Sequence, residues 1–173
     1  MAHLSWTLTA AAVGLLASGP ALAAGPTDPQ IAHIAYSAGN IDIAAGKQAL
    51  ARSHNKAVRA FASEMVRDHS AVNVQALALV KKLHVTPEAN PTSAALSKQA
   101  AATLRRLSHL YGRNFDRAYA KNEVAYHKTV NAALADTLIP SANNAELKSL
   151  LQTGLKLFSE HQHHAEHLAA TLK

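Results

Sequence analysis

The sequence contains no cysteine, and this absence limits the chemistry open to the chain. A disulfide framework, a thiol nucleophile and any thiolate-bound zinc or iron–sulfur site are excluded. Glycine and proline are scarce, at 7 and 6 of 173 residues, so collagen-like and Pro/Gly-rich disordered chains are excluded as well. Aromatic residues amount to only 5%, and alanine and leucine supply most of the apolar content. Because these two residues lose little freedom on entering a helix, the composition favours an all-helical protein.

Motifs for nucleic-acid binding and for hydrolysis are also absent from the sequence. The formal net charge is +6, but the lysines and arginines are interleaved with apolar residues, as on solvated helix faces. We therefore expect no nucleic-acid partner, and attraction to an anionic envelope surface is the consequence of the charge that we favour. No Gly-x-Ser-x-Gly elbow and no phosphate-binding glycine loop occurs. The sequence thus specifies no reaction.

The first 23 residues have the pattern of a signal peptide rather than of a folded element. An apolar run of residues 4–16 is too short for the roughly 20 residues that span a bilayer. It is followed by Ala21-Leu22-Ala23, a small-x-small cleavage signal. A short membrane anchor is the alternative interpretation. We expect cleavage after Ala23, a linker over 24–27, one domain over 28–173, and a periplasmic or outer-membrane-associated protein.

Apolar residues at helical spacing predict an up-and-down bundle of four long helices plus a short crossover helix. Asp28-Pro29 is predicted to start the first helix, with the Asp28 carboxylate capping it. Asn55 is predicted to cap the second helix. A loop around Pro87 and Pro91 precedes the short helix, expected over about 94–110. Pro140 is predicted to end the fourth helix, and Asn143 to open the last.

Five polar residues interrupt these apolar seams, where leucine or alanine is expected. Each lies near the middle of its helix at about 1.5 Å rise per residue, so all five can meet at one level of the bundle. Facing helices that each offer a nitrogen or oxygen ligand are how bundle cores hold metals. The predicted ligands are Asp42, His69, Glu123, His127 and His161. Asp68, Asp116, Tyr119 and Tyr126 are expected around them as supporting or capping residues.

Three imidazoles with one or two carboxylates and no thiolate suit zinc, copper(II) or a single iron. A carboxylate-bridged di-iron centre needs more acidic residues than this chain offers. The only Glu-x-x-His pair is Glu160 with His163, and His163 lies on the opposite side of the helix from His161. The histidines over 161–167 form a second candidate, a surface patch that collects metal weakly. On this prediction His161 and His164 face inward.

Several segments resemble the exported bacterial proteins grouped as domain of unknown function 4142. The resemblance covers about residues 28–170 and is carried by Asp28-Pro29-Gln30-Ile31, Val58-x-x-Phe61-Ala62-x-x-Met65-Val66-x-Asp68-His69, Phe115-Asp116-x-x-Tyr119, His127 and His161. It implies a ferritin-like bundle in the cell envelope, often labelled an outer membrane protein, with no established activity. It also implies that His69, His127 and His161 occupy the family's histidine positions. The family usually has Glu in the first helix, where this chain has Asp42, one methylene shorter.

Two functions from different classes follow from these observations. The first is an exported bundle that binds a transition metal in its core. The second is a non-enzymatic envelope stress or interaction protein, whose polar core is a hydrogen-bond network and whose protein partner is unknown. Catalytic residues are not indicated in either case. A homo-oligomer is compatible with both interpretations.

Overall fold

The computed structural model describes residues 25–172, which form five long helices and no strand. The helices are α1 (Asp28–Arg52), α2 (Lys56–Lys82), α3 (Pro91–Ser108), α4 (Gly112–Ala133) and α6 (Ala145–Thr171), with short segments η1 (Leu134–Leu138) and α5 (Ile139–Ser141) after α4. The expected all-α bundle is confirmed. The signal peptide predicted for 1–23 lies outside the described residues. None of the helices within 25–172 is long and apolar enough to cross a membrane.

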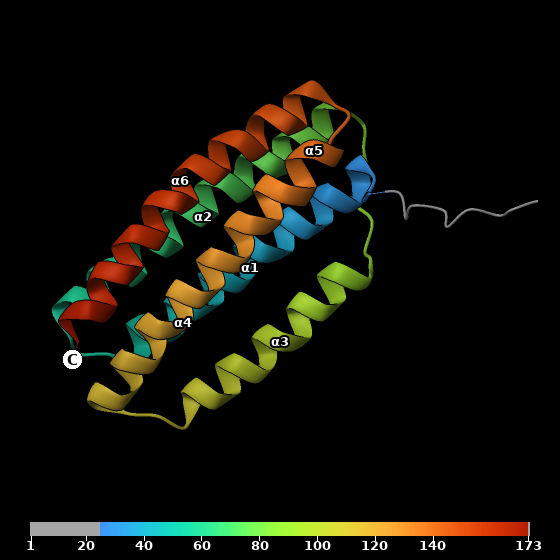
Figure 1. Ribbon diagram of the computed structural model, residues 1–173. Helices are drawn as coiled ribbons and strands as arrows, with labels where there is room; N and C mark the ends of the chain where they lie inside the picture. Colours follow the sequence, from blue (N-terminus) through green and yellow to red (C-terminus); the bar gives the residue numbers. More distant parts are fainter. Residues whose placement is uncertain (1–24, 173) are drawn as a thin grey trace, which may run out of the picture.

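Four of the helices enclose the core, and α3 lies on the outside (Figure 1). Helix α1 packs along α2, α4 packs along α6, and contacts of α2 with α6 and of α1 with α4 close the bundle. Helix α3 packs mainly against α1. It carries the chain back along the bundle, so α2 and α4 run in the same direction (Figure 1). This is the role predicted for the short crossover helix, which begins at Pro91, three residues earlier than expected.

Asparagine side chains cap the beginnings of α2, α3 and α6. Asn55 caps α2 as predicted, because its side chain accepts hydrogen bonds from the amides of Ala57 and Val58. The cap of α6 is Asn144, one residue after the position predicted. Asp28 does not cap α1, since Thr27 occupies that position. The Asp28 carboxylate instead accepts from the amides of residues 143 and 144 at 2.9 Å, which joins the starts of α1 and α6.

Pro140 does not end the fourth helix at the predicted place. The chain continues in helical form through η1, a π-helical turn, and stops after Ser141. A proline lacks the amide hydrogen and its ring clashes with the carbonyl four residues earlier in an α-helix. The wider π turn just before Pro140 changes the position of that carbonyl, so the helix widens rather than breaks.

The interior has three layers along the bundle axis. One end is a closely packed apolar cluster around Phe61, Met65, Phe115 and Tyr119, all 0% exposed. The other end is a second apolar cluster, which contains Ile31, Ile34, Leu134, Leu138, Leu147 and Leu151. The layer between them is polar. Burying polar groups costs free energy unless they are bonded to one another or to a ligand, so this middle layer is the candidate site.

Candidate metal centre

Four helices deliver one or two side chains each to the polar layer. Asp42 comes from α1, His69 from α2, Glu123 and His127 from α4, and His161 from α6. None of these residues is more than 3% exposed. The structure thus brings together all five residues that the sequence predicts as ligands. Their function as metal ligands stays a prediction.

Asp42 lies at the centre of the cluster, between two imidazoles. Its Oδ2 lies 2.9 Å from His69 Nε2 and 3.2 Å from His127 Nε2. Neither approach has hydrogen-bond geometry, so the three atoms do not satisfy one another. Ligands held at about 2.1 Å from one metal ion lie about 3.0–3.4 Å apart along the edges of an octahedron or tetrahedron. The two contacts are close to such edges, and the shorter side chain of Asp42 reaches the site.

His127 is held so that one ring nitrogen faces the cluster without a proton. Its Nδ1 donates to the carbonyl oxygen of Glu123 at 3.0 Å, one turn earlier on α4. The proton therefore belongs to Nδ1, and Nε2 directs its lone pair toward Asp42. Metal-bound histidines commonly donate their other ring N–H to a carbonyl or carboxylate in this way.

His161 is oriented in the same way by a carboxylate. Its Nε2 donates to Asp68 Oδ2 at 3.1 Å, and Arg67 binds the same carboxylate through Nε at 2.6 Å. Hydrogen bonding to Arg67 lowers the pKa of Asp68, so Asp68 is an ionised acceptor. The other nitrogen of His161, Nδ1, is buried and has no hydrogen-bond partner among the described residues. Through this hydrogen bond Asp68 orients His161, which is the supporting position expected from the sequence.

The rings of the three histidines form a triangle inside the bundle. Their centroids are 5.3 Å apart for His69 and His161, 5.6 Å for His127 and His161, and 5.8 Å for His69 and His127. One ring nitrogen of each lies within 4.8 Å of a ring nitrogen of the others. A carboxylate oxygen of Glu123 similarly lies within 4.8 Å of atoms of Asp42 and His127. Each of these two groups, which share His127, could therefore hold a metal ion.

Burial and neighbouring charges shift the pKa values of the two buried carboxyl groups in opposite directions. Burial tends to raise the pKa of Asp42, but His69 and His127 oppose this and its pKa is lowered. Burial, together with the Asp42 carboxylate, raises the pKa of Glu123 well above its usual value. Burial also lowers the pKa of His127 and of His161. These directions favour the ionised form of Asp42, the protonated form of Glu123 and the neutral forms of His127 and His161.

These shifts predict how the stability of the metal-free protein depends on pH. Between pH 7 and 5 the unfolded chain takes up protons on His127 and His161 near pH 6.5, whereas the folded chain resists both. Glu123 acts in the opposite direction, because it is protonated in the folded chain and ionised in the unfolded chain. The net difference is at most about one proton, so we expect a loss of up to about 1 kcal/mol per pH unit on acidification below pH 6.5.

Urea unfolding of the metal-free protein at pH 7, 6 and 5 measures this dependence. The variant Glu123→Gln should lose stability more steeply on acidification, because the opposing contribution of Glu123 is removed. A midpoint that does not change between pH 7 and 5 would contradict the assignment of neutral, buried imidazoles.

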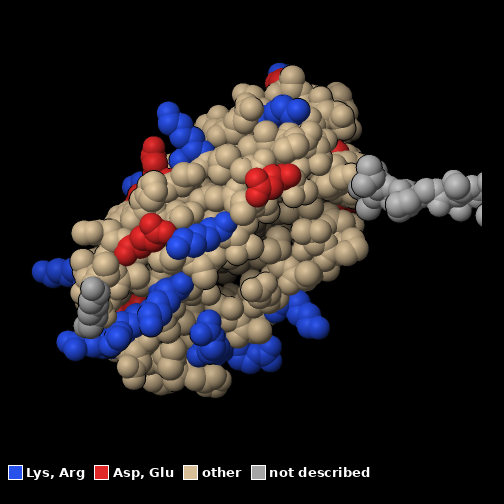
Figure 2. Space-filling view, in the orientation of Figure 1, with Lys and Arg blue, Asp and Glu red and all other residues tan. Residues whose placement is uncertain are grey.

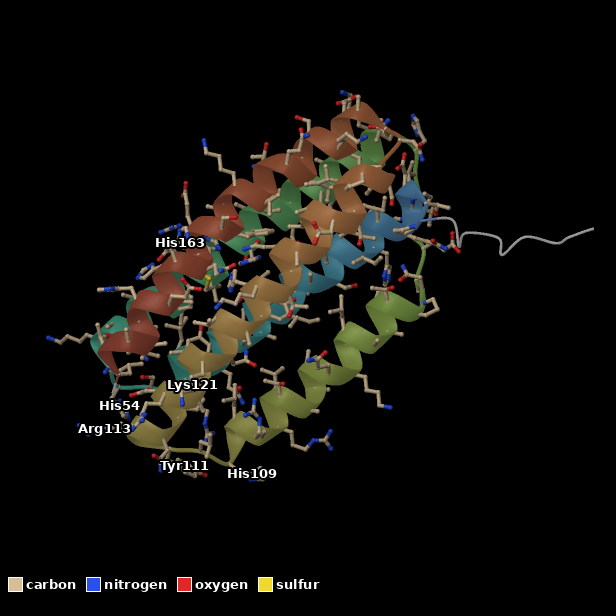
Figure 3. The ribbon with its side chains drawn as sticks, in the orientation of Figure 1. His54, His109, Tyr111, Arg113, Lys121 and His163 are labelled. Atoms are coloured by element: carbon tan, nitrogen blue, oxygen red, sulfur yellow. The ribbon has the colours of Figure 1, made fainter. Side chains whose placement is uncertain are left out.

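The other polar residues singled out from the sequence have separate positions. Tyr126 donates to the carbonyl oxygen of Ala38 at 2.8 Å and lies beside His127. Asp116 is away from the cluster, where it accepts a hydrogen bond from Ser53 at 2.5 Å. His163 points outward from α6, as predicted (Figure 3). The expectation that His164 faces inward is wrong, since its side chain is 44% exposed and its Nδ1 lies 2.8 Å from Glu64.

Two neighbours of the site were not predicted from the sequence. Phe158 stacks on the ring of His69, with centroids 4.4 Å apart and planes 14° apart. Glu64 lies near the outer side of His161, with Asp68. Phe158 precedes His161 by three residues on α6, and this spacing places both on one helix face. That spacing could have identified Phe158 from the sequence, but Leu157 fits the wide apolar stripe of α6 equally well.

Fold and site together define a class of protein, an all-α helix bundle with a buried His–carboxylate cluster able to hold a metal ion. The family model for "Domain of unknown function (DUF4142)" matches residues 14–168, and the chain belongs to this family. The resemblance stated from the sequence is thus confirmed at the level of the family. No curated protein and no solved structure matched the chain.

Proposed function

We propose that this protein binds one transition-metal ion in the core of its helix bundle. The ligands are Asp42, His69, His127 and His161, and Glu123 joins them on losing its proton. One observation carries the proposal: buried nitrogen and oxygen atoms that could bind a metal face one another and have no hydrogen-bond partners in the described chain. They are Asp42 Oδ2, His69 Nε2, His127 Nε2 and His161 Nδ1.

A metal ion explains this arrangement better than a hydrogen-bond network does. Each unsatisfied buried polar atom costs about 1–3 kcal/mol, and a network in which most members lack partners is destabilising. The N–H groups of His127 and His161 are already used on Glu123 and Asp68, so their remaining nitrogens can only accept. A cation bound by either group would satisfy acceptors that have no other partner within the described chain.

The donor set favours zinc, copper(II) or a single iron, as the sequence predicts. Neutral imidazole nitrogens suit all three metals, and the one ionised carboxylate adds charge compensation. Loading releases the proton of Glu123 if this side chain also coordinates, so metal binding should be weaker at low pH. We propose metal binding and assign no reaction to this site.

The proposal extends to a location in the cell envelope. It is supported by the leader-like residues 4–23 and by the positive charge of the domain. Exposed cations occur at the end of the bundle where α1 joins α2 and α3 joins α4, near the labelled His54, His109 and Arg113 (Figures 2 and 3). They include Lys56, Arg59, Arg105, Arg106 and Arg113. An anionic lipid surface is the partner that this end would attract.

Metal analysis of the purified protein tests the proposed function. The protein is stripped of metal with a chelator and then loaded separately with Zn²⁺, Cu²⁺ or Fe²⁺. Excess metal is removed by gel filtration, and the bound metal is measured by elemental mass spectrometry. We expect about one equivalent of at least one metal per chain, since the two groups of candidate ligands share His127. The double variant His69→Ala, His127→Ala should retain none.

A surface variant separates the core from the histidine run of α6. His163 and His167 are exposed, and replacing both with alanine removes surface imidazoles while leaving the core ligands intact. This variant should bind as much metal as the wild type. Metal that stays with the core variant but is lost from the surface variant would overturn the proposal. No metal in the wild-type protein would favour the alternative, an envelope interaction protein with a structural polar core.

A further inference from the structure

A large cavity occupies the half of the bundle that contains the starts of α1 and α6. Its volume is about 580 Å³, and residues of α1, α2, α3, α4, η1 and α6 line it. Cavities of this size are typical of small-molecule sites, whereas voids left by imperfect packing rarely exceed a few water molecules. The cavity lies beyond the polar layer and is not part of the candidate metal centre.

The two halves of the bundle differ in how completely they are packed. On the other side of the polar layer, Val58, Phe61 and Met65 of α2 are all 0% exposed. Their counterparts further along α2, at the same helical spacing, are Val72, Ala76 and Leu79, and these line the cavity and are only half-buried. The seam is therefore apolar along its whole length, but the residues of 25–172 pack closely against only one half of it.

The chemistry of the walls selects an uncharged ligand. The lining contains no Asp, Glu, Lys, Arg or His, and most of it is aliphatic. Two of its polar side chains already have partners: Asn73 donates to Asn40 at 3.0 Å, and Asn90 donates to the Gln30 carbonyl at 3.3 Å. A charged group placed here would lose its hydration without gaining a partner. A hydrocarbon chain or fused ring would lose little.

The wall on the side of α4 is formed partly by the π-helical turn. Leu134, Thr137 and Leu138 of η1 all line the cavity, and Thr137 is exposed, as is Thr92 of α3. The cavity thus meets the surface between the start of α3 and η1. Single π turns within helices occur frequently at functional sites, where they widen the space beside the helix.

We propose that this cavity is a binding site for a neutral, apolar small molecule, such as a lipid-derived hydrocarbon. Its inner wall includes Phe158, whose ring stacks on His69, so the bound molecule lies next to the metal centre without reaching its ligands. The proposal does not depend on metal binding. None of the histidines of the core lines the cavity, although Phe158 of its inner wall stacks on His69.

Titration with N-phenyl-1-naphthylamine, an uncharged dye that fluoresces in apolar surroundings, tests the site. We expect saturable binding of one dye per chain by the purified protein and also by the metal-free His69→Ala, His127→Ala variant. Ala76→Phe puts a ring into the cavity and should weaken binding by about tenfold or more. Its Tm should stay the same or rise, because filling a cavity adds apolar contacts.

A matched variant on the same helix controls for the added ring. Ala71 lies on the exposed face of α2, and Ala71→Phe should leave dye binding unchanged. Ala35→Phe fills the cavity from α1 and serves as the second test if Ala76→Phe does not fold. Absence of saturable binding by the wild type, or equal binding by folded cavity-filling variants, would overturn the proposal. Loss of dye binding only in the histidine variant would assign the dye to the metal centre instead.

Discussion

Replacing Asp42 with alanine is expected to lower the affinity for metal by about a thousandfold, the largest loss from any single substitution in the cluster. Removal even of groups that only support a ligand costs about 10–100-fold, and a directly coordinating carboxylate contributes more. Asp42 is also the carboxylate closest to the ring nitrogens, at 2.9 Å from His69 and 3.2 Å from His127. Without it, the metal's charge would be balanced only if Glu123 lost its proton.

Competition with a chromophoric chelator measures this affinity, and a second buried aspartate supplies the control. Asp116 is also buried, at 6% exposed, but its partner is Ser53 rather than the histidines. Asp116→Ala should therefore destabilise the fold while leaving the affinity for metal unchanged. An Asp42→Ala variant that binds as tightly as the wild type would show that the imidazoles alone hold the metal.

Replacing Gly46 with valine should destabilise the protein by about 3 kcal/mol or more, since two helices are in contact at this position. A Cβ atom on Gly46 would lie 2.9 Å from Val66 Cγ2 and 3.0 Å from the backbone carbonyl oxygen of Ala62. A carbonyl within a helix cannot move by itself, so α1 would have to separate from α2. Asp42 is one turn earlier on α1, and the same displacement would move it away from His69.

Substitution of a second buried glycine is expected to have the opposite effect on stability. A Cβ atom on Gly154 of α6 would meet the ring of Phe158 at 3.4 Å, which is an ordinary contact. Gly154→Ala should therefore be neutral or stabilising by up to about 1 kcal/mol, because alanine has the higher helix propensity. Urea unfolding midpoints of both variants measure the difference. Equal destabilisation by both substitutions would mean that the close contact at Gly46 is not the cause of the lost stability.

The helices were predictable because their signals lie close together in the sequence. Apolar spacing located all five long helices, and Asn55 was correctly identified as a cap because capping involves only neighbouring residues. The predictions were wrong where a side chain binds a segment that is distant in the sequence. Asp28 fits a local cap, but its carboxylate binds amides 115 and 116 residues away. The effect of Pro140 was likewise changed by the π turn, which local rules do not anticipate.

The sequence by itself determined that the protein is an all-α bundle, and that five polar residues interrupt its apolar seams at one level. Both follow from periodicity and rise along single helices. Only the tertiary structure decided that Asp42 reaches two imidazoles, that Glu123 and Asp68 orient His127 and His161, and that one half of the core contains a cavity. These features depend on the rotation and spacing of helices that are far apart in the chain, and a shift of about 1 Å is enough to change them.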